Sequence, residues 1–482
     1  MRDDGARHVV GIVLPTIARD LKASFADIEW VISAYVLCFA ALLLPAGSLA
    51  DRFGRKRVFL AGIALFAFAS FACGVAPSAP LLYIARAVQG MGAAFLLAPA
   101  LAIIGHAFHE ERERARAWAV WGGIMGLTMV LSPLIGGVIS AYLGWRWAFT
   151  INVPICALLA TGVVKIVDES RDPTPRSLDL AGIALFAAAM FSLTWALILG
   201  PEHGWLSVAV ASRACAGVAL FAMFARVESR RAYPMLDLAL FRSLPFVGAI
   251  VAMFSYASSA QVMASLLPLF LQNARGESAL SAGAGMMPFA LAMLLLPQLG
   301  RKLAKHLDSR QILTLGLSVV ACGNLAMMLA ARSAHEGWLI VAMALLGSGG
   351  GLLNGETQKA IMGTVPRDRA GMASGISTTA RFTGILLGFS GLGAVLAEGV
   401  RSALSMQMSQ MHVPLVPGFA ESVMAGDFAR AFTLYPAALT DLLIQIARSS
   451  YGTGFSQAFG AAAMVAAGSA FVVWLSMRNR KR

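Results

Sequence analysis

Residues 47–57 read Gly-Ser-Leu-Ala-Asp-Arg-Phe-Gly-Arg-Lys-Arg, and they connect two long apolar runs. Four residues of this short stretch are basic: Arg52, Arg55, Lys56 and Arg57. Lys and Arg gather in the short cytoplasmic loops of membrane proteins. The glycines Gly47 and Gly54 allow a sharp turn or a close approach of two backbones. The stretch therefore predicts a tight cytoplasmic loop between two membrane-spanning helices.

The composition of the chain supports a membrane protein. Of 482 residues, 58% are hydrophobic and 13% are charged, whereas soluble domains carry about 25% charged residues. The net charge of +13 comes from Lys and Arg in short clusters between apolar runs. Membrane topology and anionic lipid headgroups explain such clusters better than nucleic acid does. We therefore expect lipids, and no nucleic acid, as partners.

The sequence lacks the usual signs of an enzyme or a metal protein. Its five cysteines lie inside apolar runs without a C-x-x-C spacing, which predicts small buried side chains rather than metal ligands. There is also no Walker loop, no cluster of metal-ligand residues and no nucleophile triad. We therefore expect no metal, no bound cofactor and no ATP-driven pumping.

The apolar runs predict an all-α protein with about fourteen membrane-spanning helices, since each span needs about 20 mainly apolar residues. The run at 9–18 is short, so the first helix is either truncated or starts upstream. The other predicted spans are 30–50, 58–76, 81–108, 118–142, 145–167, 180–199, 208–225, 246–271, 282–299, 312–331, 338–355, 374–397 and 455–476. Basic clusters follow the even-numbered helices, which predicts that both termini are cytoplasmic.

The chain divides into three predicted parts. Residues 1–167 form a first six-helix half, 168–232 hold a linker with two extra helices, and 233–482 form a second six-helix half. The halves show a weak repeat, in which Gly90 and Gly92 correspond to Gly347 and Gly349. Within the second half, 398–454 mixes charged and apolar residues at helical spacing. This pattern predicts amphipathic helices that lie on the membrane surface.

The stretch at 47–57 resembles, position for position, the signature loop of the major facilitator superfamily, G-x-L-A-D-R-x-G-R-K. Residues 145–154, WRWAFTINVP, resemble the fourteen-helix drug:proton antiporter branch of that superfamily. The resemblance implies two parallel six-helix halves around a central pathway. It also implies that the loop acts as a gate, in which Asp51 binds either a neighbouring helix N-terminus or Arg112 across the loop.

Arg86 lies about two turns inside its predicted helix. A charge there costs at least about 2.5–3.5 kcal/mol on insertion scales. Its side chain either reaches the membrane surface or faces a central cavity. Residues 86–92 resemble the second motif of the superfamily, R-x-x-Q-G-x-G, which implies that Arg86 and Gln89 take part in proton coupling. We expect Gly90 and Gly92 to allow close helix contact.

Residues 132–137, Ser-Pro-Leu-Ile-Gly-Gly, resemble the antiporter motif G-P-x-x-G-G, with Ser132 in place of the first glycine. Pro133 followed by Gly136 and Gly137 bends a helix and lets a neighbour pack tightly. The resemblance favours an antiporter, and a purely structural kink remains the alternative.

Four further polar residues are candidates within predicted spans. Glu356 and Arg381 are candidates for proton coupling, although Glu356 could instead pair with Lys359 near the interface. Gln261 and Asn324 are candidates for the substrate pathway, or else for hydrogen bonds between helices.

Together these features predict export of hydrophobic or cationic small molecules across the inner (plasma) membrane by alternating access. The proton motive force would drive it, and a periplasmic adaptor remains open. Two alternatives are a carrier for one specific metabolite and a transport-inactive or sensor-like relative. The second is suggested by the short first helix and Ser132.

Overall fold

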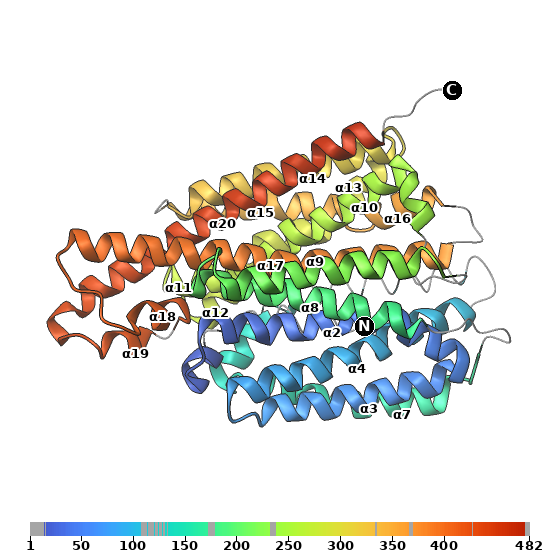
Figure 1. The fold of residues 1–482 in the computed structure, drawn as a ribbon, viewed down its shortest axis with the longest axis horizontal. Helices are drawn as coiled ribbons and strands as arrows, with labels where there is room; N and C mark the ends of the chain where they lie inside the picture. Colours follow the sequence, from blue (N-terminus) through green and yellow to red (C-terminus); the bar gives the residue numbers. More distant parts are fainter. Residues whose placement is uncertain are drawn as a thin grey trace.

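The computed structural model describes residues 16–107, 134–171, 179–231, 238–332, 335–365, 370–426 and 428–477, with isolated positions at 14, 113, 120, 124, 128, 131 and 132. The described residues are almost entirely helical and contain no strand. Most of the long helices run roughly along one axis of the molecule (Figure 1). The predicted all-α fold is confirmed.

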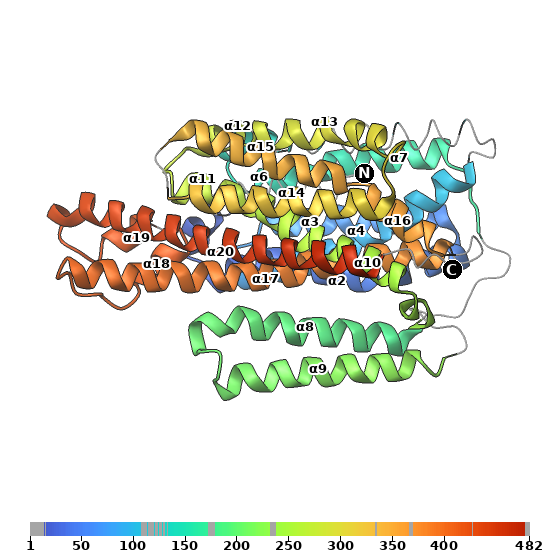
Figure 2. The same ribbon diagram turned by 90° about the horizontal axis from the view of Figure 1, so that it is seen from above.

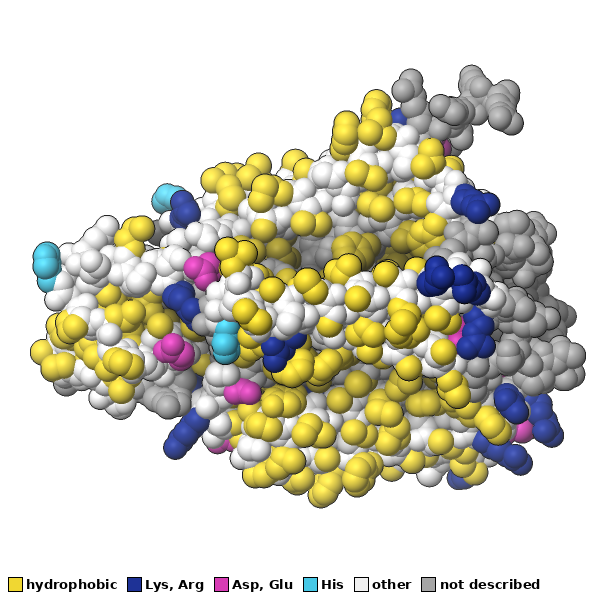
Figure 3. All heavy atoms as spheres, in the orientation of Figure 1, with side chains coloured by type: hydrophobic (Ala, Val, Ile, Leu, Met, Phe, Trp, Pro, Cys, Tyr) yellow, Lys and Arg dark blue, Asp and Glu magenta, His cyan; other side chains and the backbone are white. Residues whose placement is uncertain are grey.

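Twelve helices within the described ranges are long and apolar enough to cross a membrane. They fall on the predicted second, third, fourth and sixth to fourteenth spans. The first predicted span and the fifth are only partly described. The structure is therefore compatible with fourteen spans. Apolar side chains cover much of the middle of the molecule, and many Lys and Arg side chains gather toward one end (Figure 3).

The helices that precede residue 170 pack around α4. They are α2 (Phe25–Phe53), α3 (Arg55–Gly74), α4 (Ala79–Ala107), α6 (Trp147–Thr150) and α7 (Asn152–Ile166). Helix α4 packs along both α2 and α3, and α7 packs on the far side of α3. Helix α2 starts at a capping box. The Ser24 hydroxyl accepts a hydrogen bond from Asp27 N, and the Asp27 carboxylate accepts one from Ser24 N.

The helices that follow residue 237 form a second group around α14 and α15. They are η1 (Leu238–Arg242), α10 (Leu244–Ser255), the π-helix η2 (Tyr256–Gln261), α11 (Val262–Asn273), α12 (Ala279–Gly285), α13 (Met287–Leu303), α14 (Ser309–Ala330), α15 (Glu336–Leu353), α16 (Glu356–Gly363), α17 (Ala370–Gln410), α18 (Phe419–Met424), α19 (Phe428–Phe432), η4 (Ala437–Leu439) and α20 (Thr440–Ser476). Helix α15 packs on α13 and α14, just as α4 packs on α2 and α3.

Equivalent glycines make these contacts in the two groups. A Cβ on Gly90 would collide with the carbonyl oxygen of Tyr35 in α2, and one on Gly92 would lie 2.6 Å from a backbone nitrogen of α3. A Cβ on Gly347 would likewise collide with a backbone oxygen of α13, and one on Gly349 would lie 2.6 Å from a backbone nitrogen of α14. The predicted close contact at Gly90 and Gly92 is confirmed, and the repeat reproduces it.

The two extra helices, α8 (Leu180–His203) and α9 (Val208–Glu228), form a hairpin at the side of the bundle (Figure 2). Helix α8 contacts both α2 and α17, while α9 packs mainly on α8. Helix α2 also contacts α17 directly, so these two helices form a seam between the two groups.

The structure describes 398–454 as continuations of long helices and not as separate surface helices. Helix α17 continues without a break to Gln410, and α20 already begins at Thr440. Both helices extend beyond the bundle, with α18 and α19 between them (Figure 1). The apolar positions of this segment face a protein neighbour rather than lipid: Val400, Leu404, Met408, Leu443, Ile446 and Tyr451 are all buried. Helical spacing alone does not distinguish these two environments.

The glycine contact gives a test of the packing. We expect Gly90→Ala to lower the melting temperature in detergent, because its methyl group would push α2 away from α4, at a cost of about 1–3 kcal/mol. Gly468→Ala in α20 is the control, since a Cβ added there would have no atom within 4 Å. Equal melting temperatures for both variants would contradict close contact at Gly90.

Candidate functional site

Arg86 is held inside the first group of helices and is only 1% exposed. Its Nε donates a hydrogen bond to the carbonyl oxygen of Val31 in α2, at 2.9 Å. Its Nη1 donates to Oε1 of Gln89, at 2.6 Å. The guanidinium also lies over the Tyr35 ring, 4.0 Å from the ring centre. Arg86 therefore does not reach the membrane surface. Its donors bind α2 and its own helix instead.

Gln89 extends this network to a third helix. Its Nε2 donates a hydrogen bond to the Ser70 hydroxyl of α3, at 2.7 Å, while its Oε1 accepts from Arg86. Gln89 is fully buried. The two residues predicted from the second motif thus lie together at the meeting point of α2, α3 and α4. A change in the charge or hydrogen bonding of Arg86 would therefore alter the contacts among all three helices.

The seam between α2 and α17 contains a buried acid that sequence reasoning missed. Glu29 of α2 is 8% exposed, and a Cβ on Gly393 of α17 would collide with its carboxylate oxygen. Further along the seam, the rings of Phe39 and Phe382 meet edge to face with centroids 4.3 Å apart. The signal in the sequence was an acid inside the apolar run that begins at Ile28.

A second polar pair joins α17 to the π-helix. Arg381 Nε donates a hydrogen bond to Gln261 Oε1, at 3.1 Å. The sequence proposed these residues for different roles, whereas the structure brings them into contact. Gln261 ends the π-helix, and π-helical turns inside α-helices often lie at functional sites.

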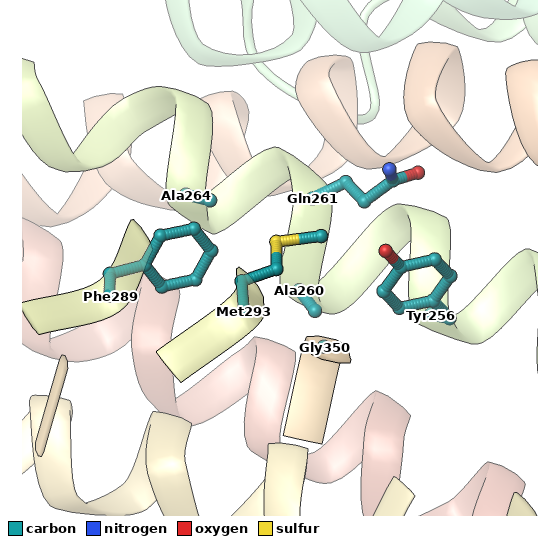
Figure 4. Close-up of a pocket in the computed structure, with 7 residues that line it drawn as sticks. All are labelled: Tyr256, Ala260, Gln261, Ala264, Phe289, Met293 and Gly350. Atoms are coloured by element: carbon teal, nitrogen blue, oxygen red, sulfur yellow. The ribbon is translucent and has the colours of Figure 1, made fainter. Parts of the chain in front are cut away.

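Gln261 lines a small pocket between the π-helix η2, α11, α13 and α15 (Figure 4). Its other lining residues are Tyr256, Ala260, Ala264, Phe289, Met293 and Gly350. No residue that lines it is charged. The lining is mostly aromatic and aliphatic, with the Gln261 amide and the Tyr256 hydroxyl as its polar groups.

The other two polar candidates, Asn324 and Glu356, are not among the residues that line this pocket. Asn324 is buried in α14 and donates to the carbonyl oxygen of Val320 in its own helix, at 3.1 Å. Glu356 starts the short helix α16, and its Oε1 lies 3.1 Å from Lys359 Nζ and accepts a hydrogen bond from Ser309. The alternative prediction that Glu356 pairs with Lys359 is therefore confirmed.

The predicted gate loop has a different geometry from the one expected. Asp51 Oδ1 accepts hydrogen bonds from Arg55 of the same loop, at 2.9 and 3.1 Å. The N-terminus of α3 is instead bound by Glu169, which follows α7. The Glu169 carboxylate accepts hydrogen bonds from Lys56 N, at 3.0 Å, and Arg57 N, at 3.3 Å. An anion at a helix N-terminus is favoured by the unpaired amides and by the helix dipole.

The two loop glycines differ in how closely they are packed. Gly54 has a φ of 107°, and a Cβ there would lie 2.6 Å from the Glu169 carboxylate, so both conformation and space require glycine. Gly47 has more room, since its nearest neighbour, Ala98 Cβ, would lie 3.9 Å away. The Arg52 guanidinium lies near the Phe53 ring and is exposed. Arg112 lies outside the described residues.

The structure describes part of the helix that carries the antiporter motif, including Ser132, Gly136 and Gly137. Ser132 is buried and donates to the carbonyl oxygen of Thr128, at 2.6 Å. Gly136 is buried as well, and a Cβ on Gly137 would lie 2.8 Å from the carbonyl oxygen of Ala279 in α12. This helix therefore meets the second group closely at Gly137. Pro133 lies outside the described residues.

At the end of the bundle away from the gate loop, Asp20 is bound by two neighbours. Trp145 Nε1 donates to its carboxylate at 2.9 Å, and Arg146 forms an ion pair with it. These hydrogen bonds, from Trp145 and then Arg146, outweigh partial burial and hold the pKa of Asp20 below its usual value. Asp20 therefore stays ionised and links residues 16–21 to the start of α6.

Removing the charge at the N-terminus of α3 tests the role of Glu169. We expect Glu169→Gln to lower the melting temperature, because an anion at such a position is worth about 0.3–1 kcal/mol at low ionic strength. The difference should shrink in high salt. Asp168→Asn makes the same change of charge at an exposed neighbour and should have a smaller effect. A larger loss for Asp168→Asn would contradict the assignment.

Known proteins resemble this chain over most of its length. The multidrug resistance protein Stp of Mycobacterium tuberculosis is 34% identical over 83% of this chain and 75% of that protein. The multidrug efflux pump LfrA of Mycolicibacterium smegmatis is 32% identical over 98% of this chain and 93% of the relative. The tetracenomycin C resistance and export protein of Streptomyces glaucescens is 31% identical over 95% of this chain and 87% of the relative.

Solved structures share the fold. A bacterial homologue of the human lysosomal transporter Spinster, in an inward-facing and occupied conformation, superposes with a TM-score of 0.67 at 16% identity, covering 98% of this chain and 93% of that one. The sequence model described as Major Facilitator Superfamily matches residues 4–389. The protein is a multi-pass membrane transporter rather than an enzyme, and it belongs to the Major Facilitator Superfamily.

Proposed function

We propose that this chain exports small hydrophobic compounds, in exchange for protons, by alternating access. The observation that carries the proposal is the buried network of Arg86 and Gln89 between α2, α3 and α4. A buried charge in a network that joins three helices provides a way for an electrostatic change to move them. The names of the relatives, which include multidrug efflux pumps and an antibiotic export protein, support drug-like substrates.

Proton exchange needs a group that binds a proton in one state and releases it in another. Glu29 lies in the α2–α17 seam, packed on Gly393. When the seam opens to water, the environment of this carboxyl changes from buried to wet, which changes its proton affinity. We therefore add Glu29 to Arg86 and Gln89 as a candidate for proton coupling, with Arg381 and Glu356 retained as further candidates.

The topology belongs to the same proposal. Both termini would be cytoplasmic in the plasma membrane, because the basic loops fall at one end of the bundle. Residues 1–167 and 233–482 would form the two moving halves, and 168–232 would carry the extra hairpin. We include no periplasmic adaptor, because the relatives come from Gram-positive-like bacteria. The proton motive force would be the only energy source; a proton moving down 100 mV supplies about 2.3 kcal/mol.

The experiment uses purified protein in liposomes that contain a pH-sensitive dye. Under an imposed pH gradient, we expect several lipophilic compounds to trigger proton movement in the wild type. Arg86→Ala should abolish the proton movement. Glu29→Gln should uncouple the transport of the compounds from the movement of protons. Arg213→Ala is the control, because Arg213 lies over Trp195 in the hairpin of α8 and α9, and the proposal gives this arginine no part in proton coupling. A silent but folded wild type would contradict drug export and favour a carrier for one metabolite or an inactive relative.

A further inference from the structure

Three buried hydroxyls come from the three helices that meet at the seam, α2, α8 and α17. Ser33, Thr194 and Ser390 are each at most 1% exposed, and their hydroxyls make no hydrogen bond with any residue that the structure describes. Other hydroxyls in the spans, such as those of Ser259 and Ser265, donate to the carbonyl oxygen four residues earlier in their own helix. A buried hydroxyl that binds neither its own helix nor a neighbour needs a physical explanation.

Helical spacing places Ser33 where the three helices meet. Glu29 of α2 packs on Gly393 of α17. The ring of Trp30, also in α2, lies 5.6 Å from the Phe191 ring of α8. Ser33 follows Glu29 and Trp30 by about one turn, and residues three or four apart share a helix face. Ser33 therefore lies between the side of α2 that meets α17 and the side that meets α8.

The other two hydroxyls lie on the matching sides of their helices. Ser390 precedes Gly393 by about one turn of α17, and Thr194 follows Phe191 by about one turn of α8. Helix α8 contacts both α2 and α17, and Figure 2 shows the hairpin beside them. Together with the Glu29 carboxyl, the three hydroxyls form one polar line at the junction of α2, α8 and α17.

This polar line costs free energy while the seam is closed. A buried hydroxyl without a partner loses its hydrogen bonds to water, and no described protein group replaces them. Water that enters an opening seam restores those bonds, so the hydroxyls favour the open, wet seam over the closed one. Each hydroxyl can also accept a hydrogen bond from one water molecule and donate one to the next group, which is what the passage of a proton requires.

We propose that the polar line of Ser33, Thr194 and Ser390 is the route by which water and protons reach Glu29, so that the hairpin of α8 and α9 takes part in proton coupling. The proposal rests on the export function above and deepens it, because it gives the two extra helices a role. A proton taken from water at one end of the line is balanced by a proton passed to the Glu29 carboxylate at the other. Thr194 is a positioning residue in this route, since its hydroxyl orders the water that serves the acid.

The first experiment detects water at the junction without substrate or a pH gradient. Thr194→Cys and Ala196→Cys are made separately in a protein that lacks its native cysteines, and their reaction with a small water-soluble methanethiosulfonate is timed in liposomes. Ala196 is also buried, at 4% exposed, but lies two residues on and therefore on another face of α8. We expect Thr194→Cys to react about tenfold faster, because a thiol must be accessible to react. Equal rates, or no reaction of either variant, would overturn the proposal.

The second experiment combines the liposome assay with the melting temperature. Thr194→Val keeps the shape of the side chain and removes its hydroxyl. We expect proton movement to slow about fivefold, which corresponds to one lost hydrogen bond, while the melting temperature stays the same or rises. Thr194→Ser keeps the hydroxyl and should retain most of the proton movement. Thr161→Val is the control, because the Thr161 hydroxyl binds the carbonyl oxygen of Leu158 in its own helix, α7.

Two outcomes would contradict the route. A lower melting temperature for Thr194→Val would mean that the hydroxyl makes a stabilising bond in the closed protein. Wild-type proton movement in Thr194→Val would mean that protons do not depend on it, and would leave the export function standing. A silent wild type would instead contradict export itself, and the proton route with it.

Discussion

Burying the Arg86 guanidinium is the constraint on which the first group of helices depends. A charge in this position is tolerated only where protein groups replace water around it. The carbonyl of Val31, the amide of Gln89 and the ring of Tyr35 all do so. Two of these groups belong to α2, and Gln89 in turn binds α3. The close packing of α4 on both neighbours, which Gly90 and Gly92 permit, brings the acceptors within reach.

The second group repeats the glycine contacts and not the buried charge. Gly347 and Gly349 bring α15 against α13 and α14, yet the arginine of this group, Arg381, lies on a different helix and binds Gln261 beside the pocket. The common fold therefore carries two different polar arrangements. One joins helices within a half, and the other joins α17 to the π-helix. The α2–α17 seam separates them.

Much of the fold could be predicted from the sequence, because span length and apolar composition fix where helices cross a membrane. The close helix contacts of Gly90 and Gly92 were predicted correctly, because small residues at a fixed spacing in a span indicate where a neighbouring helix packs. The sequence did not predict which residue binds the N-terminus of α3. Glu169 lies there only because α7 packs on α3. The continuation of α17 past Ala397 was also missed, because a stripe of apolar residues packs equally well on lipid or on α20. Contacts between distant residues, such as Arg381 with Gln261, need the folded chain.

The central claim is that transport requires the seam between α2 and α17 to open. The most direct measurement replaces Phe39 and Phe382, whose rings are 4.3 Å apart, with cysteines in a protein that lacks its native cysteines. The account predicts that a flexible bis-methanethiosulfonate cross-linker joins the two cysteines in the membrane, that transport stops once they are joined, and that a reducing agent, which cleaves the link, restores transport. Undiminished transport by the fully cross-linked protein would contradict the account.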